Sequence, residues 1–164
     1  MTDNRPTPLR WLWLAVFVLI LDQISKWAAT AWLSYAEPVP VMPLLNMTLL
    51  HNTGAAFSFL ASAGGWQRWF FTLIALAISI VLVIWLWRLP ARERLTGAAL
   101  ALVLGGALGN LIDRVLYGYV VDFIDVYYGS WHWPAFNIAD SAITVGVALL
   151  LWTSLRPAAS APRN

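Results

Sequence analysis

Two carboxylates near the end of the chain have apolar neighbours, and their types and spacing suggest acid–base chemistry. Asp122 lies in "YVVDFIDV", and Asp140 follows about eighteen residues later in "FNIADSAI". Two close carboxylates cannot both be ionised cheaply, so such a pair shares one proton. One carboxylate then acts as a base on a water molecule while the other donates its proton to a scissile carbonyl. This hydrolytic chemistry requires no cofactor.

Other catalytic and binding chemistries find little support. The chain has no cysteine, which excludes disulfides, thiol catalysis and thiolate metal sites. Ser25 and Lys26 are adjacent and diverge on a helix, so they cannot form a Ser–Lys dyad. His51 and His132 lie far apart without the spacing of metal ligands, and no glycine-rich phosphate loop follows a strand. We therefore expect no metal and no cofactor. The ten basic residues are scattered, so nucleic acid is not an expected partner.

Asp140 also has a purely structural interpretation. Asn137 lies three residues earlier and is a good N-cap, and acids in a first helical turn are stabilised by the helix dipole. That feature alone favours a structural role for Asp140. Asp122 is harder to explain in this way, because it lies between apolar pairs in an outer loop and requires a partner. Asp125 follows it by three residues.

Further polar residues interrupt the apolar segments, where an ionisable group is costly to insert. Asp22 and Lys26 are four residues apart on one helix face, which predicts a structural ion pair that orients the first helix. In "GGALGNLIDR", a stripe of small residues at 101, 105 and 109 would let another helix approach closely. An adjoining face carries Gly106, Asn110, Asp113 and Arg114.

The elements that must position these residues are membrane-spanning helices. Hydrophobic residues make up 60% of the chain, its mean hydropathy is +0.69, and only 11% of residues are charged. Four segments have the roughly 20 apolar residues that a bilayer requires, and only helices satisfy their own backbone there. The predicted fold is therefore all-α, one integral membrane domain of residues 1–164, with spans at about 11–33, 66–87, 95–116 and 138–155. Asp22 and Lys26 interrupt the first span, so we expect it to be retained, not cleaved as a signal peptide.

The distribution of basic residues predicts the orientation of these spans. Arginines occur in both terminal tails and in the connection between the second and third spans, whereas the loops 34–65 and 117–137 contain no lysine or arginine. Cytoplasmic loops carry the excess of basic residues. We therefore expect both termini in the cytoplasm and both acids, Asp122 and Asp140, on the outer side. Prolines break residues 35–60 into a pattern typical of short strands, and "GSWHWPAF" indicates a turn.

Five blocks of sequence, in order along nearly the whole chain, resemble one family. They are "LDQISK", "HNTGAAFS", "GGALGNLIDR", "VVDFIDV" and "FNIADSAI". The chain resembles the bacterial lipoprotein signal peptidases, or type II signal peptidases. The resemblance implies an aspartic peptidase of the bacterial inner membrane, whose four helices carry a small extracytoplasmic β-sheet called the cradle. Its substrates would be diacylglyceryl-modified prolipoproteins, cut just before the lipidated cysteine. Membrane lipid and the cyclic peptide inhibitor globomycin would be its other partners.

The same resemblance assigns roles to particular residues. It implies that Asp122 and Asp140 are the catalytic dyad, which overrides the structural interpretation of Asp140. The residues it implies for substrate binding are Asn52, Gly54, Asn110, Asp113, Arg114 and Asn137. A helix N-terminus favours an ionised carboxylate, and burial favours a protonated one. We therefore expect Asp140 to be the base and Asp122 the acid.

Two other functional classes remain open. A small transporter could move protons or cations through its intramembrane acids, but these acids gather near one side of the membrane and only Asp22 lies deep. A scaffold could use the stripe of small residues to assemble partners, but it gives no reason for paired acids. Cleavage of a lipidated precursor by purified protein, without metal or nucleotide, distinguishes these classes.

Overall fold

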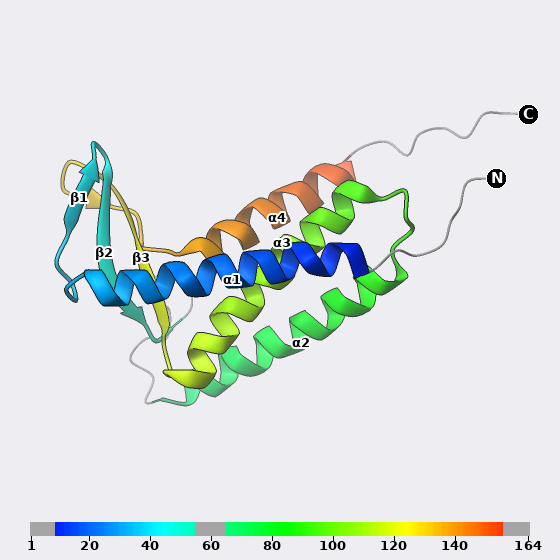
Figure 1. Ribbon diagram of the computed structural model, residues 1–164, viewed down its shortest axis with the longest axis horizontal. Helices are drawn as coiled ribbons and strands as arrows, with labels where there is room; N and C mark the ends of the chain where they lie inside the picture. The colour runs from blue at the N-terminus through cyan, green and yellow to red at the C-terminus, as the bar shows by residue number, and fades with distance from the viewer. Residues whose placement is uncertain (1–8, 55–64, 156–164) are drawn as a thin grey trace, which may run out of the picture.

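The computed structural model describes residues 9–54 and 65–155, which form a helical bundle with a small sheet at one end (Figure 1). In chain order the elements are α1 (Leu9–Trp32), β1 (Val39–Met42), β2 (Leu45–Asn52), α2 (Trp66–Arg88), α3 (Arg94–Leu116), β3 (Val120–Tyr128), β4 (Trp131–His132) and α4 (Ile138–Leu155). All four helices are long and apolar enough to cross a membrane. Their ends lie within two residues of the spans expected from hydropathy.

Helix α3 lies at the centre of the bundle and packs against α1, α2 and α4. Its buried positions are mostly glycine, alanine, leucine and valine, whereas large apolar side chains on the other three helices are exposed. An exposed apolar surface of this extent suits helices whose solvent is lipid. The fold is thus that of a helical membrane protein with a small sheet.

Small residues on α3 allow its neighbours to approach closely, as the stripe predicts. A Cβ atom added to Gly105 would lie 2.6 Å from the backbone oxygen of Ala15 in α1. One added to Gly109 would lie 2.5 Å from Asp22 Oδ2. On the adjoining face, Gly106 meets the backbone of α4 in the same way. Glycine at these positions therefore brings α1 and α4 against α3.

The sheet is antiparallel throughout, in the order β1-β2-β3-β4. In the pairing of β2 with β3, Leu50 lies opposite Asp122 and Asn46 lies opposite Asp125, with an irregularity between Met47 and Leu50. The strands predicted within residues 35–60 are therefore present as β1 and β2, and residues 55–60 lie outside the described ranges. The segment 117–137 contains two strands, β3 and β4, where the sequence suggested only a loop and a turn.

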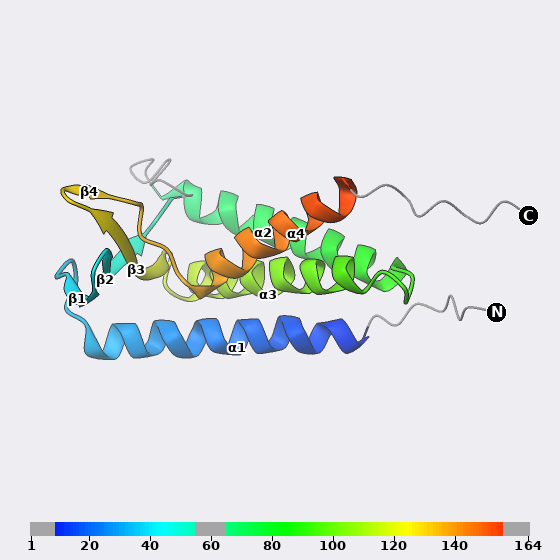
Figure 2. The same ribbon diagram turned by 90° about the horizontal axis from the view of Figure 1, so that it is seen from above.

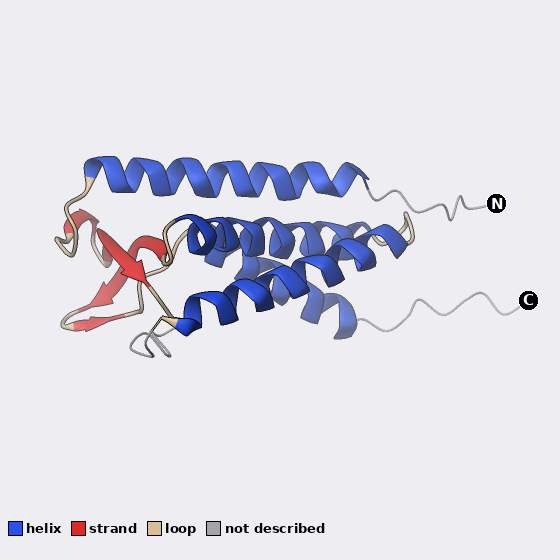
Figure 3. Ribbon diagram, turned by 90° about the horizontal axis from the view of Figure 1, so that it is seen from below, coloured by secondary structure: helices blue, strands red, loops and turns tan. Residues whose placement is uncertain are grey.

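The sheet lies at one end of the helical bundle, and the start of α1 and the end of α4 lie at the other. Figure 2 shows the start of α1, the end of α4 and the α2–α3 connection together, and Figure 3 shows all four strands beyond the other end. Arg10 of α1, Arg88 at the end of α2, and Arg92 and Arg94 next to the α2–α3 connection are at the first end, where Arg10 donates a 3.1 Å hydrogen bond to the carbonyl of Ala91. The bundle therefore has one basic end and one end that carries the sheet.

Candidate active site

The two predicted catalytic carboxylates come from different elements and meet at one residue. Asp122 lies on β3, and Asp140 lies in the first turn of α4. Asn137 contacts both, because its side-chain Nδ2 donates to Asp122 Oδ1 at 2.8 Å and its backbone N donates to Asp140 Oδ2 at 3.3 Å. A strand and a helix that are separate in sequence are thus joined with their acids on either side of one asparagine.

Asn137 is the N-cap of α4, as the sequence predicts. Its Oδ1 accepts a 2.9 Å hydrogen bond from the backbone N of Asp140, while Asp140 accepts one in return from the backbone N of Asn137. This reciprocal pattern is a capping box with aspartate in the third helical position. Asn110 of α3 donates to the other oxygen, Asp140 Oδ1, at 2.8 Å. Both oxygens of Asp140 therefore accept hydrogen bonds from fixed donors, which suits an ionised carboxylate.

The surroundings of Asp122 favour its protonated form. The side chain is only 3% exposed, and Asn52 of β2 donates to its Oδ2 at 3.1 Å. Burial and then the nearby charge of Asp140 raise the pKa of Asp122 to about 7, although the hydrogen bond from Asn52 opposes them. At neutral pH a large fraction of Asp122 therefore keeps its proton.

A buried charge cluster lies beside the dyad. The predicted Asp22–Lys26 ion pair is present, with Lys26 Nζ 2.8 Å from Asp22 Oδ2, and the structure adds Asp113 at 2.9 Å from the same ammonium. None of these three side chains is more than 4% exposed. Lys26 also donates to Asn110 Oδ1 at 2.9 Å, so the cluster contacts a residue that holds the dyad. Two carboxylates and one amide oxygen surround one ammonium, and the pairing offsets the cost of burying these charges.

This cluster also fixes the backbone next to each predicted catalytic residue. Asp22 Oδ1 accepts a 2.9 Å hydrogen bond from the backbone N of Ala139, the neighbour of Asp140. Asp113 Oδ2 accepts one of 3.1 Å from the backbone N of Val121, the neighbour of Asp122. The ion cluster therefore positions the two elements that carry Asp122 and Asp140, and its role extends beyond the orientation of one helix that the sequence suggested.

Gln23 completes this network and was not identified from the sequence. Its amide donates to Asp113 Oδ1 at 2.9 Å and to Asp22 Oδ2 at 3.2 Å. A third bond, of 3.3 Å, reaches the carbonyl of Gly109 on α3. The available signal was a polar residue directly after Asp22 in an otherwise apolar span.

The residues predicted to bind substrate fall into two groups. The first group consists of Asn52, Gly54 and Arg114, which lie together. Gly54 donates its backbone N to Asn52 Oδ1 at 3.0 Å, and its carbonyl accepts a 3.2 Å hydrogen bond from Arg114 Nη2. The Arg114 guanidinium also lies 5.5 Å from the centre of the Phe71 ring. Asn52 and Arg114 are only partly buried, so this group can contact a ligand.

The second group consists of Asn110, Asp113 and Asn137. Asp113 is 1% exposed and Asn137 is fully buried, and a direct contact of either with substrate stays a prediction. Their hydrogen bonds go instead to the dyad, to Lys26 and to the backbone of β3. Asn110 is 7% exposed and contacts Asp140, Asn137 and Lys26. The three side chains position the carboxylates.

Arg68 on α2 secures the outer end of α3 and was also not identified from the sequence. Its Nε donates to the carbonyl of Arg114 at 2.8 Å, and its Nη2 donates to that of Val115 at 2.6 Å. These are carbonyls of the last helical turn, which have no partners within the helix. Arg68 therefore fixes the turn of α3 from which Arg114 extends.

Metal chemistry has no obvious site in the described part of the chain. Within residues 9–54 and 65–155, no three His, Cys, Asp or Glu side chains gather as metal ligands would. In the same ranges every buried side-chain nitrogen and oxygen has a hydrogen-bond partner. The arrangement is therefore a saturated polar network around two carboxylates of unlike surroundings, which suits acid–base hydrolysis.

Comparison with known proteins gives consistent matches over almost the whole chain. The family model described as Signal peptidase (SPase) II matches residues 14–156. A lipoprotein signal peptidase of Acinetobacter baumannii is 58% identical over 159 residues, covering 97% of this chain and 90% of the relative. One from Acinetobacter baylyi is 60% identical over 146 residues, covering 89% and 82%.

Solved structures show the same architecture. A bacterial membrane enzyme determined by the in meso method has a TM-score of 0.84 and 34% identity, and the match covers 99% of this chain and all of the other. A second such structure has a TM-score of 0.81 and 35% identity, with 96% of this chain covered.

Proposed function

This chain belongs to the signal peptidase II family of aspartic proteases, and from that premise we propose that it removes the signal peptide from lipid-modified prolipoproteins. In this proposal the cut falls just before the lipidated cysteine. The observation that carries it is the pair of carboxylates, Asp122 and Asp140, joined through Asn137. Both acids accept hydrogen bonds from fixed donors, and Asp122 is in addition buried with a raised pKa.

The proposed reaction begins with an ionised Asp140 and a protonated Asp122. Asp140 takes a proton from water as the water oxygen bonds to the scissile carbonyl carbon, and Asp122 gives its proton to the carbonyl oxygen. In the second step, the proton held by Asp140 passes to the departing amide nitrogen as the C–N bond breaks. Asp122 recovers its proton from the collapsing diol, so the dyad returns to its starting state. The products are a carboxyl group on the signal peptide and a free amine on the lipidated cysteine.

The asparagines and the charge cluster maintain the starting geometry for this reaction. Asn110 and Asn137 hold Asp140, and Asn52 and Asn137 hold Asp122. Groups that are already oriented need no reorganisation in the transition state. Asn52, Gly54 and Arg114 are proposed to bind the substrate backbone beside the dyad.

The proposed location is the bacterial inner membrane, with both termini in the cytoplasm and the dyad at the outer face. The basic end of the bundle supports this orientation, because cytoplasmic loops carry the excess of basic residues. The apolar faces of the helices would contact membrane lipid and admit the acyl chains of the substrate from the side. Globomycin, which inhibits the family, would inhibit this enzyme. A transporter is not favoured, because the buried charges are paired in one cluster and form no chain across the bundle.

The proposal is tested with purified protein in detergent and a lipidated precursor, without metal or nucleotide. Asp122→Asn and Asp140→Asn should each fold and each lose cleavage by about 10²- to 10⁴-fold, the contribution typical of one acid–base group. The double variant should be little worse than either single one, since residues that act as a unit are not additive. The same precursor without its diacylglyceryl group should be a poor substrate.

The matched control is Glu37→Gln, which makes the same acid-to-amide change at an exposed position of the outer loop. It should cleave like wild type. Normal cleavage by both dyad variants would remove the aspartic mechanism. Equal cleavage of lipidated and unlipidated precursors would show instead that the lipid is not recognised.

A further inference from the structure

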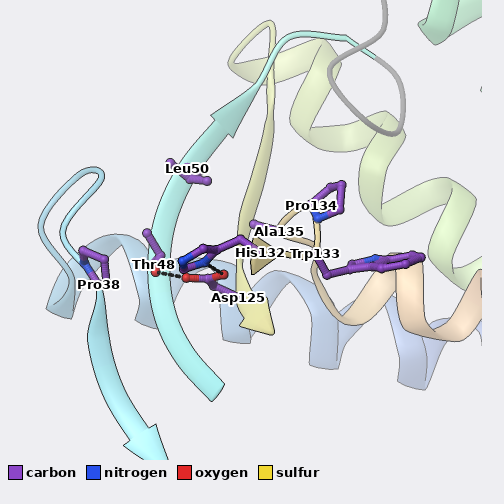
Figure 4. Close-up of a pocket in the computed structure, with 8 residues that line it drawn as sticks. All are labelled: Pro38, Thr48, Leu50, Asp125, His132, Trp133, Pro134 and Ala135. Carbon is purple, nitrogen blue, oxygen red and sulfur yellow. Dashed lines mark hydrogen bonds and ion pairs between the residues drawn. The ribbon is translucent and has the colours of Figure 1, made fainter. Parts of the chain in front are cut away.

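A cavity of about 510 Å³ lies on the sheet, outside the dyad (Figure 4). Its lining residues are Pro38, Thr48, Leu50, Asp125, His132, Trp133, Pro134 and Ala135. Five of these eight are proline, leucine, tryptophan or alanine, and one, Asp125, is an acid. The volume falls within the range of about 300–1,000 Å³ typical of ligand pockets. The reaction proposed above uses none of these residues.

Asp125 is the polar centre of this cavity and is held by donors from both neighbouring strands. Its Oδ2 accepts hydrogen bonds from Thr48 Oγ1 at 3.0 Å and from Asn46 Nδ2 at 3.3 Å, both on β2. Its Oδ1 lies 2.7 Å from Nδ1 of His132 on β4. Burial alone would favour the neutral acid, but these hydrogen bonds outweigh it and hold the pKa of Asp125 below its usual value. Asp125 is therefore an anion at neutral pH.

The carboxylate of Asp125 retains capacity for another donor. An ionised carboxylate offers about four acceptor positions, and the three contacts above occupy three of them. The side chain of Asp125 is 8% exposed and that of His132 is 47% exposed, so the Asp125–His132 pair is accessible at its His132 edge. With a neutral imidazole, the cavity carries one net negative charge. Trp133, which also lines the cavity, is 47% exposed, and Figure 4 shows its ring extending away from the Asp125–His132 pair.

The cavity lies on the strand that carries Asp122. Leu50, one of its lining residues, pairs directly with Asp122 across the sheet. Asp125 follows Asp122 by three residues on β3, about 10 Å of extended chain, and the alternation of a strand places the two side chains on opposite faces of the sheet. Ala135, which also lines the cavity, is two residues from Asn137. We therefore expect a peptide that leaves the dyad to reach the cavity past the segment of Ala135, a few residues after the cut.

We propose that this cavity is a subsite for a basic side chain in the mature part of the substrate, a few residues after the lipidated cysteine. The inference rests on the proposed function, because it assumes that a peptide is cut at the dyad. The sheet lies beyond the helices, so the portion of substrate that reaches it is the portion that leaves the membrane.

A lysine or arginine matches the chemistry of the cavity better than other residues do. Its cationic head supplies the missing donor to Asp125, and its aliphatic stem packs on Leu50 and the prolines. A partly exposed ion pair contributes modestly, and the packing of the stem adds to it. Together they should raise kcat/KM about three- to tenfold. An acidic side chain would be repelled by Asp125.

The test uses lipidated precursors that differ only in one residue, lysine, glutamine or glutamate, at each of the second to fifth positions after the lipidated cysteine. At one or two of these positions wild type should prefer lysine to glutamine by about three- to tenfold in kcat/KM and disfavour glutamate. The preference should weaken at high salt, because exposed charge pairs are screened. In Asp125→Asn the ratio for lysine over glutamine should fall to about one.

Each ratio is measured within one enzyme, so a general loss of activity in Asp125→Asn cancels from it. The matched control is Glu93→Gln, which removes an exposed carboxylate at the opposite end of the bundle and should keep the wild-type preference. If wild type cleaves all precursors equally, or Asp125→Asn keeps the preference, the subsite is wrong while the proposed function stands. If no precursor is cleaved at all, the proposed function itself fails.

Discussion

At the scale of single residues, the two catalytic candidates are chemically identical and differ only in where they lie. Asp140 is in a helix N-terminal turn, where Asn110 and the backbone of Asn137 donate to its oxygens. Asp122 is on a strand and 3% exposed, with its pKa raised by burial. On this difference rests the proposal that Asp140 is the base and Asp122 the acid.

This asymmetry predicts how activity depends on pH. The proposed acid, Asp122, must carry a proton, and its pKa is about 7. Below that value the acid is protonated and competent, and above it the acid is ionised. We therefore expect kcat/KM on a lipidated precursor to decline as pH rises from about 6 to 9, approaching a tenfold loss per pH unit beyond the pKa.

The measurement is a pH–rate profile in detergent, accompanied by melting temperatures to show that the protein stays folded. A flat profile across this range would mean that Asp122 does not supply the proton. A profile that rises with pH would mean that Asp122 acts as the base and that the two roles are reversed.

The two acids, Asp122 and Asp140, and the N-cap at Asn137 were predicted from the sequence, because a motif and the spacing of neighbouring residues can be read from the sequence directly. It did not show that Asp113 and Asn137 are buried, nor that Gln23 and Arg68 support the site. Burial and cross-element hydrogen bonds depend on which helices pack together. Nor could the contact between Asp125 and His132, which the pairing of β3 with β4 brings to 2.7 Å, be predicted from local spacing.

At the scale of elements, the close packing of α1 on α3 links a glycine to the charge cluster. A Cβ at position 109 would lie 2.5 Å from Asp22 Oδ2, the oxygen that pairs with Lys26. Gly109→Ala must therefore displace either α1 or the ion pair. We expect a loss of about 1–3 kcal/mol in stability, as for other overpacked cores. Cleavage should fall as well, since Asp22 also holds Ala139.

Thermal unfolding in detergent and kcat/KM are measured on the same preparations. The control is Val115→Ile, which adds a similar bulk to an exposed position of the same helix and should change neither. If Gly109→Ala were as stable and as active as wild type, the close contact between these helices would not constrain the site.

The helices were predictable because each is a long apolar run bounded by polar residues. Strands β3 and β4 were not, although their residues include several β-branched and aromatic types. Whether such a short segment forms a strand depends on an edge to pair with, and β2 supplies that edge from about 70 residues earlier in the chain. Pairing across such a separation is not visible in local sequence.

At the scale of the whole molecule, the bundle has a basic end and a sheet-bearing end, and this asymmetry predicts its orientation. The chain has no cysteine, so single cysteines can report which side is exposed. Two single-cysteine variants are used, Ser130→Cys and Glu93→Cys. Position 130 lies between β3 and β4, and position 93 lies directly before α3. Both positions are exposed.

A membrane-impermeant maleimide should label Ser130→Cys in intact spheroplasts and label Glu93→Cys only after the membrane is opened. Both variants should retain cleavage, which shows that the labelled protein is native. The reverse labelling pattern would place the dyad on the cytoplasmic side and contradict the proposed location.

The order of elements along the chain has a consequence for the life of the protein in the cell. Asp122 lies on β3, whereas Asp140 lies on α4 and Asn137 is its N-cap, so the proposed dyad is complete only after α4 has been synthesised. A nascent chain with only α1, α2 and α3 inserted lacks the contact of Asp22 with Ala139 and the contact of Asp122 with Asn137. In the proposed mechanism such a chain lacks the base and cannot cut. We therefore expect the enzyme to become active only when α4 docks on α3.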